Sequence, residues 1–177
     1  MPRIRKLLFL LWIFILLTAL SACRSPSVDY FAYREEPFSA RLEGNQYGID
    51  TVCDIYCENG SMKKIVFHAP DSLEGLCVSS GSDGSFRMEK DEIFHSFSGD
   101  YPWELGLLSP ARWLLLEGIS EDSVQSIQKI STGHLITILS PSDSGELTVS
   151  LGQDGFPTSI CGSNFSFRVT KNVNSDS

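Results

Sequence analysis

The sequence predicts a mainly β protein: a strongly curved antiparallel sheet, or an incomplete barrel, with an apolar helix against its concave face. Three observations support this. Apolar and polar residues alternate with a period of two over most of residues 38–170, short turns rich in Gly, Asn and Asp separate the alternating runs, and one dense apolar segment interrupts them. Such alternation is typical of strands with one buried and one wet face. About nine strands are expected.

The first half of the chain supplies the longest alternation. Residues 47–57 place Tyr, Ile, Thr, Cys, Ile and Cys on one face, with acidic residues on the other. Asn59-Gly60 then predicts a type I′ hairpin turn into a strand over 63–69. A further apolar strand is expected over 73–78, and a turn over 89–92.

The apolar segment at 101–118 predicts the helix. Ser109-Pro110 is a suitable N-cap and first-turn pair and Gly118 a suitable stop, so a short helix is expected over 110–117. Its side chains admit two interpretations, packing in the core or lining a cavity for an apolar ligand. The candidate cavity residues are Trp103, Leu105, Leu108, Trp113 and Leu116.

The C-terminal half repeats a strand and turn succession through residues 133–138, 145–151 and 154–160, the last beginning Asp154-Gly155-Phe156-Pro157. This layout resembles the LolA/LolB-like lipoprotein-carrier superfamily. The resemblance implies an open barrel closed by helices over an apolar cavity, and it carries over no functional residue.

The N-terminus has the order of a secretory signal. Three basic residues precede Leu7–Leu20, an apolar run of 14 residues without a charge that is too short for a comfortable membrane span. Leu20-Ser21-Ala22-Cys23 follows and resembles the lipobox of bacterial lipoproteins. The resemblance implies cleavage between Ala22 and Cys23 and attachment of acyl chains such as palmitate to Cys23.

These patterns predict a signal peptide at 1–22, a lipidated tether at 23–36, one β-rich domain at 37–170 and a polar tail at 171–177. Cleavage would leave 155 of 177 residues and remove three basic residues and no acidic one, which takes the net charge from −8 to −11. Such an acidic chain is not expected to bind nucleic acid. An anionic membrane would repel it, so the lipid is expected to anchor it to the extracytoplasmic face of the cell membrane.

Four cysteines follow Cys23. The sequence allows two interpretations for them, disulfide bonds or buried free thiols. The four cysteines are Cys53, Cys57, Cys77 and Cys161. Cys53 and Cys57 are not expected to pair together, because four strand residues separate Cα atoms by about 13 Å, beyond the limit of about 7 Å for a bridge. They share a face, so either could meet Cys77 or Cys161 on a neighbouring strand.

No motif predicts catalysis, a cofactor or a metal site. His68, His95 and His134 stand in no metal-binding spacing, and no nucleophile motif is present. We therefore expect a non-enzymatic lipoprotein that binds or carries an apolar ligand, such as a lipid, in a sheet–helix cavity. An envelope protein-interaction or structural module is the alternative, and a hydrolytic enzyme is the third hypothesis.

Overall fold

The computed structural model describes residues 29–81, 83–98, 106, 108–139 and 145–172. One compact unit begins at Phe31 and contains every strand. The predicted signal peptide, Ala22 and Cys23 lie outside the described residues, as do Trp103 and Leu105. Residues 31–36, assigned to the tether from the sequence, join the compact unit: Phe31 is buried and a 3-10 turn, η1, spans Ala32–Arg34.

Eleven strands, one α-helix and two short 3-10 turns make up the described chain. The remaining elements are β1 (Phe38–Gln46), β2 (Ile49–Glu58), β3 (Ser61–Ala69), β4 (Cys77–Ser80), β5 (Ser85–Lys90), β6 (Ile93–Ser98), α2 (Ser109–Leu115), η3 (Glu121–Ser123), β7 (Val124–Ile130), β8 (Gly133–Leu139), β9 (Glu146–Leu151), β10 (Pro157–Gly162) and β11 (Phe165–Asn172).

All eleven strands belong to one antiparallel sheet in the order β6-β5-β4-β3-β2-β1-β11-β10-β9-β8-β7. The chain starts in the middle at β1 and moves outward by hairpins to β6. It continues through α2 to the opposite edge at β7 and returns by hairpins to β11. There β11 pairs with β1 from Ser39↔Asn172 to Gln46↔Phe165. The edge strands β6 and β7 do not pair with each other, so the predicted curved, unclosed sheet is confirmed.

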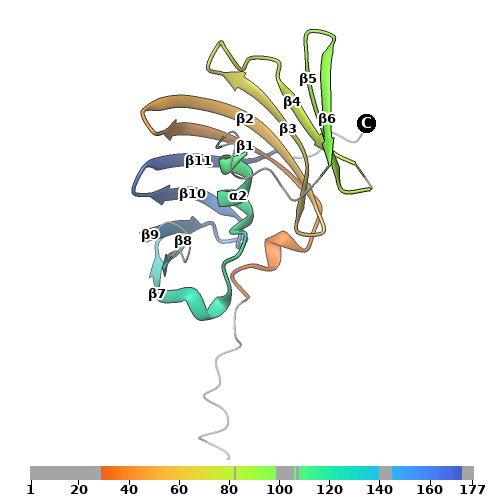
Figure 1. The fold of residues 1–177 in the computed structure, drawn as a ribbon. Coiled ribbons are helices and arrows are strands. Elements are labelled where there is room, and N and C mark those ends of the chain that lie inside the picture. The colour runs from red at the N-terminus through yellow and green to blue at the C-terminus, as the bar shows by residue number, and fades with distance from the viewer. Residues whose placement is uncertain (1–28, 82, 99–105, 107, 140–144, 173–177) are drawn as a thin grey trace, which may run out of the picture. The chain divides into compact units, whose positions relative to one another are not determined.

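The core lies between the sheet and α2. In Figure 1 the strands curve around α2, which packs against β3 and β10 from the inside. Alternate residues of the central strands point inward and are almost fully buried, for example Leu42, Ile55, Ile65, Val149 and Phe167. The period of two in the sequence therefore corresponds to the two faces of this sheet.

Helix α2 differs from its prediction at both ends. It begins at Ser109, whose side chain caps nothing, and it ends at Leu115, followed by Leu116 in a left-handed conformation (φ 49°). The last turn of a helix leaves carbonyl groups without helical partners. Here the Tyr33 hydroxyl donates to the Leu114 carbonyl at 2.7 Å, and Arg34 donates to the carbonyl of Leu115 at 3.3 Å. The segment before β1 thus caps the helix.

Two further expectations from the sequence need correction. The nine expected strands are eleven in the described chain. The strand expected over 73–78 forms only from Cys77, since residues 71–75 make a turn with Gly75 at φ 78°. The Asn59-Gly60 turn is confirmed, with φ of 51° and 71°.

Candidate functional site

The predicted cavity residues divide between core and pocket. Leu108 and Leu116 are each 1% exposed and pack in the core, and neither is among the described lining residues of the pockets below. Trp113, 7% exposed, lines a small pocket at one end of the sheet. Trp103 and Leu105 lie outside the described residues.

An apolar groove of about 290 Å³ lies between the start of α2 and one end of strands β1 to β3. Its described lining is Gln46, Tyr47, Ile49, Thr51, Phe67, Leu73, Gly106 and Pro110. The buried Gln46 side chain donates to the Gly106 carbonyl at 3.4 Å, which ties β1 to the chain leading into the helix. Ligand pockets commonly measure about 300–1,000 Å³, so this groove suits one slender apolar group.

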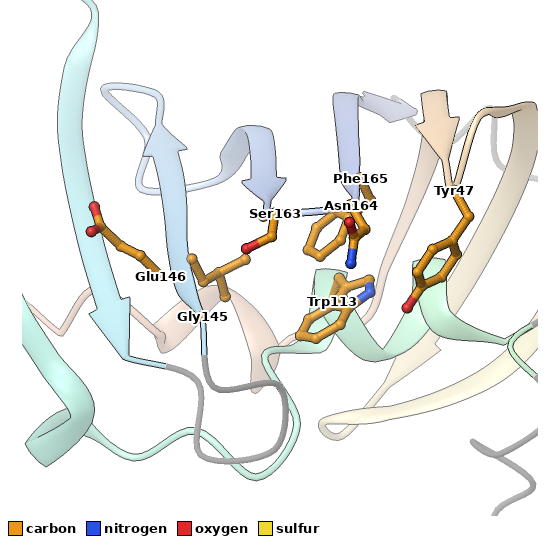
Figure 2. Close-up of a pocket in the computed structure, with 9 residues that line it drawn as sticks. Tyr47, Trp113, Gly145, Glu146, Ser163, Asn164 and Phe165 are labelled. Atoms are coloured by element: carbon orange, nitrogen blue, oxygen red, sulfur yellow. The ribbon is translucent and has the colours of Figure 1, made fainter.

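A small pocket of about 90 Å³ adjoins the groove at Tyr47 (Figure 2). It is lined by Tyr47, Trp113, Gly145, Glu146, Leu147, Gly162, Ser163, Asn164 and Phe165. These residues come from the β1–β2 turn, α2, the start of β9 and the β10–β11 turn. The Trp113 indole stacks on Phe165 with ring centroids 4.5 Å apart and an interplanar angle of 17°.

Tyr47 is the functional candidate that the sequence did not reveal. Alternation assigned it to a strand, but with Gly48 it forms the two-residue turn between β1 and β2, and their φ angles are 51° and 82°. A bulky residue in the left-handed region is uncommon. Its side chain is 68% exposed, so core packing does not explain the residue. The following Gly48 was the available signal for a turn.

Two hydrogen bonds donated by backbone N–H groups hold the Tyr47 turn. The Tyr47 N–H donates to the Asn164 carbonyl at 2.8 Å, and the Gly48 N–H donates to the Asn45 side chain at 2.8 Å. Gly44 lets β1 approach β11 here, because a Cβ on Gly44 would overlap the Ser166 backbone oxygen. The β1–β2 and β10–β11 turns are thereby placed side by side over Trp113.

All four cysteines of the sheet are free thiols. Cys53 and Cys57 alternate with half-buried or exposed neighbours and share the concave face, as predicted. Burial raises the pKa of each thiol to about 12. Cys77 and Cys161 are half-buried and lie on the other face, beside the inward-pointing Val78 and Ile160. Of the two alternatives left open by the sequence, the structure has free thiols, because the sheet separates Cys53 and Cys57 from Cys77 and Cys161.

The three histidines considered in the sequence do not form a cluster. His68 lies on the outer face, where its Nε2 is 2.6 Å from Asp54 Oδ2. His95 is on β6 and His134 on β8. In the described ranges, no three His, Cys, Asp or Glu residues are arranged to hold a metal ion.

An open hollow of about 730 Å³ also lies on the sheet, lined by Glu43, Gly44, Asn45, Asp50, Val52, Thr158, Ser159, Ser166, Phe167 and Arg168. Most of these side chains are polar. The hollow is therefore more polar than the groove and suits a lipid-like ligand less well.

Comparison with known proteins identifies the fold alone. No protein-family model matches the chain, and no curated protein matches it. A crystal structure described as an uncharacterized conserved protein from Thermus thermophilus is similar with a TM-score of 0.55 and 12% identity, over 85% of this chain and 86% of that one. The structure of PNGF-II aligns with a TM-score of 0.36 and 8% identity over 80% of this chain and 29% of its own, too low to support an argument. The Thermus protein shares the fold.

Among the described helices, none has the length and apolar character needed to cross a membrane.

Proposed function

We propose that this chain is a lipoprotein, anchored through Cys23 to the extracytoplasmic face of a cell membrane, that binds an apolar ligand between its sheet and α2. The order of basic residues, apolar run and lipobox in residues 1–23 supports the anchor. The layout of an open sheet around a helix, resembling the lipoprotein-carrier superfamily, supports the ligand-binding role.

The apolar groove is the observation that carries the ligand-binding role. Phe67, Leu73 and Pro110 provide apolar walls, and Ile49 stays 54% exposed at the rim. An exposed apolar side chain beside a concave apolar surface gains free energy when a ligand removes both from water, by about 25 cal/mol per Å². The groove therefore favours an acyl chain or a similar slender apolar group.

Leu73→Asp tests the groove by placing a charge in its wall. The full-length protein, purified from its cells without detergent exchange, should yield bound lipid by mass spectrometry, and the variant should lose it. Ile93→Asp is the matched control, because Ile93 is 76% exposed on β6, outside the groove. Absence of lipid from the unaltered protein, or equal lipid in both variants, would exclude ligand binding in the groove.

A Cys23→Ala variant tests the anchor separately. Cells fed a labelled fatty acid should incorporate label into the unaltered chain and none into the variant. Label that persists on Cys23→Ala would show that another residue is acylated.

One observation favours the alternative of an envelope protein-interaction module. The hairpin of β5 and β6 exposes Ile93 at 76% and Phe94 at 62%, side by side at its turn. Exposed neighbouring apolar side chains are typical of contact surfaces. Ile93→Asp should then abolish capture of a partner while Leu73→Asp leaves it intact, the reverse of the lipid result.

A further inference from the structure

We infer that the small pocket binds the uncharged, hydroxyl-bearing headgroup of an amphiphile whose single chain occupies the apolar groove. The headgroup chemistry is that of a sugar or glycerol. This inference rests on the proposed function and specifies its ligand.

The first step is an unused hydrogen-bond donor. Trp113 is only 7% exposed, yet its indole N–H is not among the described buried polar atoms that lack a partner, so the N–H is open to the pocket. Figure 2 shows the nitrogen edge of the indole on the side of Tyr47 and Asn164, all of which line the pocket. An acceptor on a ligand in the pocket would receive a hydrogen bond from this N–H.

The second step is the strained turn. Tyr47 occupies a left-handed conformation that Asn or Gly would adopt at lower cost, and its exposed ring adds nothing to the core. Backbone strain of this kind is concentrated at ligand sites. Tyr47 lines both the groove and the small pocket. A ligand with an apolar chain and a polar head would contact it on both sides.

The third step is charge, which disfavours ionic headgroups. None of the described lining residues of the small pocket is basic, so a phosphate or carboxylate would find no cation there. A cation is disfavoured as well. Phe165 covers one face of the Trp113 ring, and the Arg112 guanidinium already lies 5.3 Å from the ring centroid.

The remaining polar groups of the small pocket are suited to bind the hydroxyl groups of a ligand. The Tyr47 and Ser163 hydroxyls and the Asn164 amide both donate and accept, as a sugar or glycerol hydroxyl does. The volume of about 90 Å³ is too small for an acyl chain and would take a glycerol head or one edge of a sugar ring. Neutral polyhydroxyl recognition is therefore the chemistry that the lining residues share.

Competitive photolabelling tests this inference. The full-length protein is placed in phosphatidylcholine nanodiscs and labelled with an octyl glucoside that carries a diazirine at its chain end, and labelled peptides are mapped by mass spectrometry. Octyl glucoside and monooctanoylglycerol should compete at least tenfold better than octanoate or octyltrimethylammonium, and their order distinguishes a sugar from a glycerol head. A diazirine-bearing octane without a head should label the same groove peptides.

Variants link the preference to the small pocket. Trp113→Phe keeps the ring stack and removes the N–H, and Asn164→Ala removes an exposed amide with no core contact to lose. Each should weaken glucoside competition about 3–10-fold, the effect of one hydrogen bond, without changing labelling by the headless probe. Asn59→Gly, in the turn at the other end of β2, is the matched control and should change neither.

Two failures can be told apart. If every head competes equally while the headless probe labels the groove, the headgroup inference is wrong and the groove proposal stands. If no octyl probe labels the groove, the groove proposal fails, and the headgroup inference fails with it.

Discussion

The two turns that bound β2 have the same backbone form and opposite sequence character. Asn59-Gly60 and Tyr47-Gly48 both place two successive residues at positive φ, between 51° and 82°. Asn adopts that conformation readily and Tyr does not. The first turn only reverses the chain, whereas the second stands between the apolar groove and the small pocket. A residue that departs from the local preference thus lies where a ligand would bind.

The largest effect is expected at the Tyr47 end, from Gly44→Ala. The added Cβ would meet the Ser166 backbone oxygen, which no side-chain rotation relieves. We expect the free energy of unfolding to fall by about 3 kcal/mol, the upper range for overpacking, as measured by urea denaturation. Gly75→Ala is a control for glycine loss, because Gly75 has open space around it and, unlike Gly44, a positive φ. An equal loss in both would show that close packing of β1 on β11 does not hold this end.

The next effect concerns the buried strand between the turns. Burial raises the pKa of Cys53 from 9.0 to about 12, so its thiol favours the folded state below pH 9 and loses that contribution as the pH rises from 9 toward 12. At pH 10.5 the loss is about 2 kcal/mol. Cys53→Ala should flatten the decline of unfolding free energy between pH 8 and 10.5. An unchanged slope would contradict burial of this thiol.

The comparison of the two turns can be tested by placing a Tyr, the residue found at position 47, at position 59. Asn59→Tyr should lower the free energy of unfolding by about 1 kcal/mol, because Tyr tolerates the left-handed conformation less well. Thermal unfolding followed by circular dichroism measures the change. A neutral result would mean that the Tyr47 turn is not strained and would remove one support for the ligand site.

The sequence predicted the sheet because burial follows a period of two. It also predicted the Asn59 turn, where residue type and backbone form agree. It misplaced Tyr47 for the same reason, since alternation runs without interruption from Tyr47 to Cys57 and hides a turn whose first residue is atypical. The strand expected over 73–78 failed because its apolar residues wrap a turn at Gly75.

The pairing of strands that are far apart in the sequence could not be predicted from the local pattern of apolar and polar residues. The contact of β1 with β11 joins residues more than 100 positions apart, such as Ser39 and Asn172, and no period within a strand specifies its partner. The apolar groove and the small pocket depend on that pairing, because it brings Asn164 beside Tyr47. Leu108 and Leu116 could not be separated from Trp113 by sequence either, since all three are large and apolar.

Tyr47→Asn tests the central claim most directly, with two quantities measured on one variant. Asn suits the left-handed position, so the free energy of unfolding should stay equal or rise by up to about 1 kcal/mol. Competition by octyl glucoside for the photolabelled groove should at the same time weaken about tenfold. A variant that is less stable than the unaltered protein, or that binds the glucoside equally well, would contradict the account.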